Sequence, residues 1–97
     1  MTDVAKFAAD NPELFAAQVR AARGLLNWSQ AYLAEGIGVA RSTIADLESN
    51  KRAPHPATLF VLIQELAAAG IEFGELGVSF EKYPPSAYVP TGIKQKK

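Results

Sequence analysis

Signals that start and stop helices follow one another at short intervals along this 97-residue chain. Asn11 and Pro12 open a segment in which apolar residues recur at helical spacing, and Asn27 marks its end. Ser29 is a helix-capping residue two positions later, and Gly36 is expected to end the segment that it starts. The chain is therefore limited to short helices, which must pack together to bury their apolar faces.

Two further helices are expected before residue 71. One runs from about Arg41 to Ser49, although Ala40 at its cap position offers no side-chain acceptor. The other is opened by Pro56, carries a strong apolar stripe and stops at Gly70. A short extra turn of helix upstream, packed on the helix that follows it, is indicated by Val4, Phe7 and Ala8.

The period of the apolar residues changes after Gly70. Residues 71–73 and 78–80 alternate between apolar and polar side chains, and two glycines lie in the segment between them, which predicts a small β-hairpin. Tyr83, the prolines around it and Tyr88 favour an extended arm, followed by a tail that ends in lysines. We therefore expect a helical domain over residues 1–70, and a hairpin, arm and tail over residues 71–97.

Composition excludes several classes of protein. Apolar residues make up 48% of the chain, which is ordinary for a folded domain, and 10 basic residues balance 10 acidic ones. The absence of cysteine and the presence of a single histidine argue against a zinc site and favour a reducing cytoplasm. No apolar run is long enough for a membrane helix, and no signal peptide is evident. We expect no enzyme activity, no metal and no cofactor.

Two short helices joined by a glycine turn carry the functional signal. The pattern resembles the helix-turn-helix of the Cro and phage-repressor family, also called xenobiotic-response-element-like regulators, over roughly residues 15–66. The residues that carry the resemblance are Arg23, Gln30, Leu33, Ala34, Gly38, Val39, Ile44, Leu47 and Glu48.

The resemblance implies an all-α protein, a compact bundle of four or five helices whose third helix enters the DNA major groove. Ile44 and Leu47 are expected to face the core, and the first turn of that helix to face base edges. The candidate base-reading residues are Arg41, Ser42, Ala45 and Asp46. Arginine suits this role because its two-pronged head matches the acceptors of guanine.

Phosphate contacts are expected around that helix. The candidates are Gln30 at a helix N-terminus, Lys51 and Arg52 in the following loop, and Arg20 on the first long helix. Between residues 18 and 56 the chain carries five basic and three acidic residues, a net charge of +2 within a neutral protein. Double-stranded DNA is therefore the predicted partner.

Two structural roles complete the interpretation. The family resemblance pairs Arg23 with Glu48 in a partly buried salt bridge that fixes the recognition helix. The hairpin has one apolar face, which must pack on the bundle or on another subunit because two strands alone are barely stable in water. We expect a homodimer whose contacts include Ile71, Phe73, Val78, Phe80, Tyr83 and Tyr88.

The sequence thus predicts a sequence-specific transcriptional regulator, a repressor that binds a pseudopalindromic operator as a homodimer. Two alternatives stay open. One is an antitoxin or controller that binds a second protein, such as a toxin, through the segment after Gly70 and regulates its own promoter. The other is a protein-interaction adaptor that has lost DNA binding.

Overall fold

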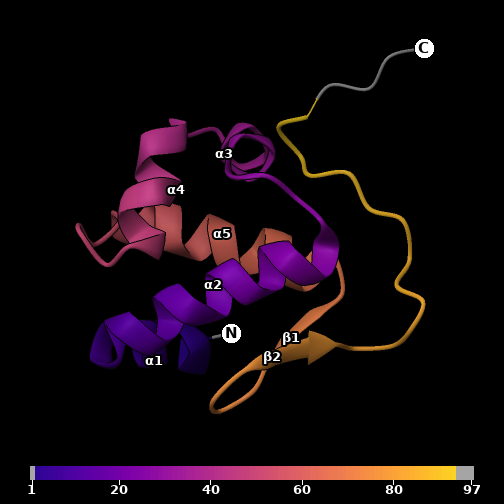
Figure 1. Ribbon diagram of the computed structural model, residues 1–97, viewed down its shortest axis with the longest axis horizontal. Coiled ribbons are helices and arrows are strands. Elements are labelled where there is room, and N and C mark those ends of the chain that lie inside the picture. Colours follow the sequence, from indigo (N-terminus) through magenta and orange to yellow (C-terminus); the bar gives the residue numbers. More distant parts are fainter. Residues whose placement is uncertain (1, 94–97) are drawn as a thin grey trace.

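A computed structural model describes residues 2–93 as five helices followed by a two-stranded hairpin and an arm (Figure 1). The elements are α1 (Thr2–Asp10), α2 (Pro12–Leu26), α3 (Gln30–Ile37), α4 (Arg41–Glu48), α5 (Pro56–Ala68), β1 (Ile71–Phe73) and β2 (Val78–Phe80). The predicted helical bundle with a short C-terminal hairpin is confirmed. The lysines of the predicted tail, Lys94, Lys96 and Lys97, lie outside the described residues.

Two of the predicted helix starts differ in their capping. The Ser29 hydroxyl accepts a hydrogen bond from the Tyr32 amide at 2.9 Å, so the predicted cap of α3 is confirmed. Asn11 does not cap α2 with its side chain, contrary to prediction. Its side-chain nitrogen, Nδ2, instead lies 3.4 Å from the Phe7 carbonyl oxygen, because α1 is longer than one turn and ends immediately before Asn11.

The end of α3 also departs from prediction. Gly38, rather than Gly36, adopts the left-handed conformation that ends the helix, with φ 77°. The amide of Val39 then donates to the Ala34 carbonyl at 2.9 Å. Gly36 lies inside the helix and is buried, so a glycine is present there for a reason other than helix termination.

The hydrophobic core lies where α2, α3, α4 and α5 meet. Its fully buried side chains are large and apolar: Phe15, Val19, Leu33, Ile44, Leu62, Ile63 and Leu66. Burial of each contributes roughly 1.5–3 kcal/mol to folding. Helices α3 and α4 each supply only a few of these side chains, so the orientation of these two helices depends on their packing against α2 and α5.

The hairpin packs on the bundle of its own chain. Its strands are antiparallel with Ile71 opposite Phe80, and the Phe73 ring stacks on Phe15 with 5.8 Å between centroids. The buried Gln18 amide donates at 2.9 Å to the carbonyls of both glycines in the turn. Ile71 is only 4% exposed, so the core of its own subunit leaves little of this side chain for the predicted dimer contact.

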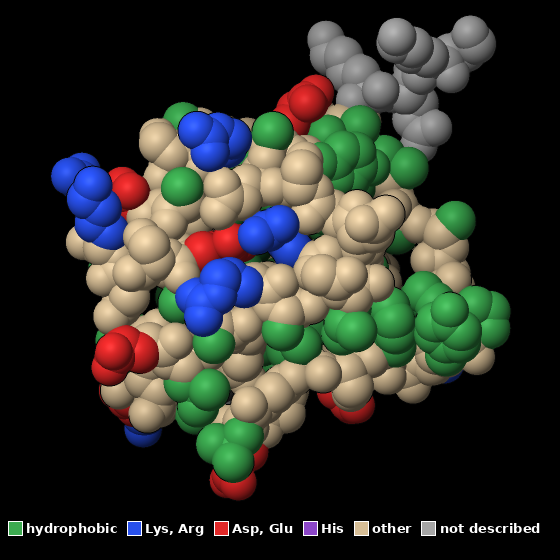
Figure 2. All heavy atoms as spheres, in the orientation of Figure 1, with side chains coloured by type: hydrophobic (Ala, Val, Ile, Leu, Met, Phe, Trp, Pro, Cys, Tyr) green, Lys and Arg blue, Asp and Glu red, His purple; other side chains and the backbone are tan. Residues whose placement is uncertain are grey.

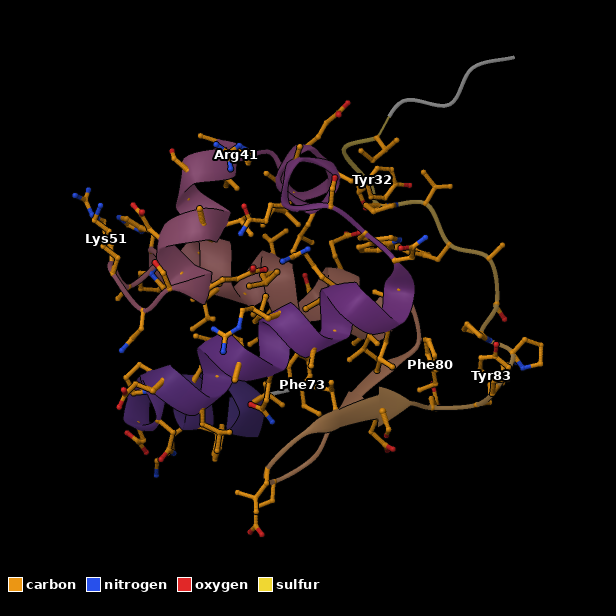
Figure 3. All side chains as sticks on the ribbon, in the orientation of Figure 1. Tyr32, Arg41, Lys51, Phe73, Phe80 and Tyr83 are labelled. Atoms are coloured by element: carbon orange, nitrogen blue, oxygen red, sulfur yellow. The ribbon has the colours of Figure 1, made fainter. Side chains whose placement is uncertain are left out.

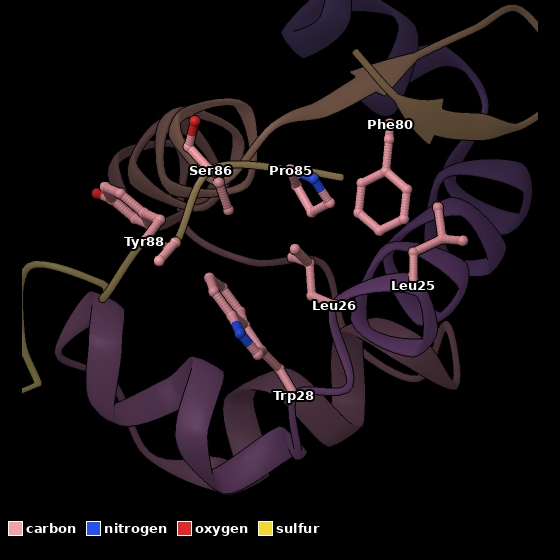
Figure 4. Close-up of a pocket in the computed structure, with 9 residues that line it drawn as sticks. Leu25, Leu26, Trp28, Phe80, Pro85, Ser86 and Tyr88 are labelled. Atoms are coloured by element: carbon pink, nitrogen blue, oxygen red, sulfur yellow. The ribbon is translucent and has the colours of Figure 1, made fainter. Parts of the chain in front are cut away.

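Residues 83–93 form an arm that runs along one side of the molecule from β2 to α3 (Figure 1), and it contacts α5 through Tyr88 and Thr91. The Pro90 side chain is fully buried, and the Gly92 amide donates to the Gly36 carbonyl at 2.8 Å. Between the arm and the end of α2 lies a pocket of about 190 Å³, into which the Trp28 indole points (Figure 4). The arm therefore packs on the outer side of α3, the first helix of the helix-turn-helix.

Glu65 of α5 anchors the arm. It is 8% exposed and accepts hydrogen bonds from the Tyr88 hydroxyl at 2.7 Å, and from the Thr91 amide and hydroxyl at 3.1 and 2.8 Å. Burial raises the pKa of the Glu65 carboxyl, but these hydrogen bonds outweigh it and hold the pKa below its ordinary value of 4.5. The carboxylate is thus the form that fastens the arm.

Replacement of Glu65 by glutamine is expected to destabilise the protein by about 1–2 kcal/mol at neutral pH, because hydrogen bonds to a charged acceptor are lost. A lowered folded-state pKa contributes stability above the unfolded pKa, and this contribution disappears as the pH falls through the folded value. The difference between wild type and Glu65→Gln should therefore be constant above pH 4.5 and shrink below it. Urea unfolding at several pH values measures it; a difference that grows in acid would contradict the role of the carboxylate.

Candidate nucleic-acid interface

Helices α3 and α4 form the helix-turn-helix. Ile44 and Leu47 of α4 are buried, as predicted, and they leave the opposite face of the helix open. The α3–α4 turn is short because Gly38 reverses the chain within a few residues. The N-terminus of α3 and the first turn of α4 consequently belong to one surface.

An ion pair joins α2 to the end of α4. Arg23 Nε and Nη2 donate to the two Glu48 carboxylate oxygens at 2.6 and 2.7 Å, and the Glu48 side chain is 3% exposed. Hydrogen bonds to Glu48 raise the pKa of the Arg23 guanidinium despite its partial burial. The structure therefore brings together the two residues that the family resemblance pairs.

The polar network extends from this ion pair to the tip of α4. Gln30 donates from Nε2 to Glu48 Oε1 at 3.0 Å, and its own carbonyl oxygen accepts from Arg41 Nη1 at 3.2 Å. On the other side Arg23 donates to the Trp28 carbonyl at 2.9 Å, directly before the cap of α3. A continuous chain of hydrogen bonds thus links Arg41 to the interior of the bundle.

The predicted base-reading residues occupy the open face of α4 to different degrees. Arg41 and Ser42 in the first turn are exposed, whereas Ala45 and Asp46 are half-buried. Figure 3 shows Arg41 at one end of α4 and Lys51 beyond the other. Side chains in the first turn are therefore the ones that reach furthest from the surface.

The predicted phosphate contacts fall into two groups. Lys51 and Arg52 are exposed in the loop after α4, where the Lys51 amide donates to the Asp46 carbonyl at 2.8 Å. Arg20 and Gln30 are instead engaged within the protein: Arg20 donates to the Glu48 carbonyl, and Gln30 to its side chain. The amides of Gln30 and Ala31, the first two of α3, have no acceptor within the helix.

Basic side chains gather on this face, over α2 and α4, in Figure 2. The acidic groups on this face include Glu48, whose charge the paired Arg23 compensates, and the half-buried Asp46 of α4. The surface can therefore attract a polyanion although the whole chain is neutral.

Sequence reasoning missed three features of the site. It did not foresee that Gln30 bridges Glu48 and Arg41, or that Tyr32 packs on Trp28 with 5.4 Å between ring centroids. It also did not foresee that the predicted arm packs on α3. A signal for this contact existed in Gly36, a glycine within a helical segment that already had a second glycine to end it.

No helix among residues 2–93 combines the length and apolar character that a membrane span requires. Within the same residues, no three metal-binding side chains gather into a cluster.

Comparison with known proteins gives one match. The helix-turn-helix family matches residues 19–69, just over half of the chain. Neither the curated proteins nor the solved structures contain a significant match to this sequence. The matched segment includes α3, α4 and the polar network between them. The chain therefore belongs to the helix-turn-helix family of the Cro and repressor type, whose members are DNA-binding transcription regulators.

Proposed function

We propose that the protein is a repressor that binds a pseudopalindromic operator as a homodimer, in a reducing cytoplasm. One observation carries the proposal. Arg41, the exposed arginine at the tip of α4, is oriented by Gln30 and through it by the buried Glu48. A preoriented guanidinium at the start of a recognition helix suits bidentate contact with guanine in the major groove.

In this proposal the surface divides into base-reading and phosphate-binding positions. Arg41 and Ser42 read bases, with Ala45 and Asp46 behind them. Lys51 and Arg52 contact phosphates, as do the amides at the start of α3 beside Gln30. Arg20 supports the surface by its bond to the end of α4 and lends its charge to the phosphate contact.

Alanine variants of Arg41 and Lys51 are expected to weaken DNA binding in different ways. Arg41→Ala should lose about 1–3 kcal/mol on the preferred operator and lose discrimination at one symmetric base pair. Lys51→Ala should weaken all sequences about equally and reduce the salt slope by about one counterion per subunit. Titration of both variants against operator and scrambled duplexes at several salt concentrations measures this.

Lys82 provides the matched control, since it is exposed and follows β2, away from the helix-turn-helix. Lys82→Ala should leave both affinity and salt slope at the wild-type values. If Arg41→Ala keeps the wild-type base preference at every position, Arg41 contacts phosphate only. The base specificity must then come from Ser42 and its neighbours.

The proposed dimer needs a revised contact surface. Of the predicted contacts, Phe73, Val78 and Phe80 pack against the core, and the Tyr88 hydroxyl is bound to Glu65. Tyr83 is 81% exposed beside Phe80, with 5.6 Å between ring centroids. The apolar patch offered to a second subunit is therefore centred on Tyr83 and includes the exposed Leu25, which lies near Phe80 (Figure 4).

Light scattering is expected to show a dimer for the wild type and a monomer for Tyr83→Asp, because a charge in this patch would be buried without a partner. Leu76→Asp is the matched control: Leu76 is 78% exposed in the hairpin turn, outside the patch, and its variant should stay dimeric. A wild-type monomer at high micromolar concentration would refute the dimer.

The two alternatives predict different results, each in an experiment of its own. An antitoxin or controller would co-purify with an unrelated small protein. An adaptor would shift no DNA in a gel at low salt. The orientation of Arg41 by Gln30 favours DNA recognition over an adaptor, because a surface without a DNA partner has no use for it.

A further inference from the structure

A large cavity lies on the side of the molecule where α1 meets the loop before α5. This α1–α5 cleft measures about 610 Å³ and is lined by α1, the start of α2, the end of α4, the loop and the start of α5. Both α1 and the loop are at the left of Figure 1. Cavities that hold small molecules span about 300–1,000 Å³, so the cleft has the size of a ligand site.

The lining of the cleft is strongly amphipathic. Its floor is apolar and includes Phe15, which is 1% exposed, and Leu47, which is 6% exposed; Phe60 lies at the rim and is 49% exposed. Two exposed cations, Lys6 and Arg52, also border the cavity. Among the side chains that the structure describes, those of residues 4 and 6–93, none that lines the cleft is acidic.

From this we propose that the α1–α5 cleft binds a small amphipathic anion, with an apolar body on the floor and a carboxylate-type head between Lys6 and Arg52. Charge complementarity selects this occupant: a neutral apolar molecule would gain no attraction from the two cations, and a cation would be repelled by them. The apolar body adds affinity by leaving water.

The cleft is coupled to the DNA surface through Arg52. Arg52 lines the cavity and also belongs to the loop that is proposed to grip phosphate, next to Lys51. An anion that engages Arg52 removes one phosphate contact per subunit and places a negative charge beside the DNA backbone. The ligand would therefore release the operator, an inference about regulation that rests on the proposed function.

Calorimetry without DNA tests the site by itself. The probes are naphthalene-2-carboxylate and its neutral isostere, naphthalene-2-carboxamide. The carboxylate should bind the wild type about tenfold more tightly, a difference of about 1.4 kcal/mol. Equal affinities, or no binding of either probe at millimolar concentration, would overturn the proposal.

Three variants locate the probe. Lys6→Gln should reduce the preference for the carboxylate from about tenfold to about threefold, because Arg52 still borders the cleft, while Lys82→Gln, at an exposed lysine elsewhere, should leave it unchanged. Ala9→Phe fills the cleft from α1 and should abolish binding of both probes. A carboxylate affinity that neither Lys6→Gln nor Ala9→Phe changes would place the probe elsewhere. If Ala9→Phe instead dissociates a dimer of the wild type, the cleft holds a second copy of the chain and the ligand proposal is wrong.

The regulatory step is measured with the selected operator. Saturating carboxylate should weaken operator binding at least fivefold, and saturating operator should weaken carboxylate binding by the same factor, because coupling is reciprocal. The carboxamide should change neither. If carboxylate selectivity holds but the protein binds no DNA, the proposed function fails and the ligand site stands. Operator affinity unchanged by carboxylate would overturn the coupling.

Discussion

Replacement of Glu48 by alanine is expected to destabilise the protein by about 3–5 kcal/mol. The substitution leaves Arg23 without the two hydrogen bonds that hold its charge, and leaves the amide of Gln30 without its acceptor. A large share of a small domain's stability would be lost, since the whole amounts to about 5–15 kcal/mol. Urea unfolding followed by circular dichroism measures the effect.

The double variant Arg23→Met/Glu48→Leu should recover much of that stability, because an apolar pair replaces a buried ion pair at little cost. It should not recover operator binding, since Gln30 would then have no anchor from which to orient Arg41. Glu35→Ala, at an exposed glutamate of α3, is the matched control and should change stability by less than about 0.5 kcal/mol. Glu48→Ala unfolding at the wild-type urea midpoint would show that the ion pair does not support the fold.

The second large effect concerns two glycines that share a place near the end of a helix but differ in surroundings. A Cβ atom at Gly24 in α2 would meet nothing within 4 Å, whereas one at Gly36 in α3 would overlap the Cβ of Pro90 and lie 3.1 Å from its Cγ. Gly24→Ala should therefore stabilise the protein by up to about 1 kcal/mol, the gain in helix propensity. Gly36→Ala should destabilise it by about 1–3 kcal/mol, because the arm is overpacked.

Thermal and urea unfolding of both variants measure the opposite signs. Trp28 is the only tryptophan and lies beside the arm, so its emission reports whether the arm detaches in Gly36→Ala. Gly24→Ala should leave that emission unchanged. Stabilisation of equal size by both substitutions would mean that the arm does not pack on α3 in solution.

The sequence predicts most of the fold because local rules decide it. Apolar spacing located α2 to α5, and the alternation after Gly70 predicted both strands with the bounds that the structure has. The end of α3 was mistaken because Gly36 and Gly38 both satisfy the rule for a terminating glycine, and only tertiary packing distinguishes them. Local patterns suffice where a residue's role depends on its neighbours in sequence.

The candidate site was predictable in position but less so in contacts. The resemblance placed Arg41, Lys51 and Arg52 on the surface, where they are exposed. It did not reveal that Gln30 and Arg20 both bond to Glu48, since these contacts join residues 18 and 28 positions apart. The path of the arm was equally hidden, because an extended segment rich in proline has no period that indicates which surface it covers.

The position of the arm in the chain sets the order in which a newly made molecule can mature. Gly92 is synthesised 24 residues after Ala68, the last residue of α5. At about 5–20 residues per second, the ribosome needs roughly 1–5 s to cover that distance. The residues that donate to Glu65, Tyr88 and Thr91, are added shortly before Gly92. The contacts of the arm with α5 and α3 are therefore among the last tertiary contacts that a newly made molecule can form.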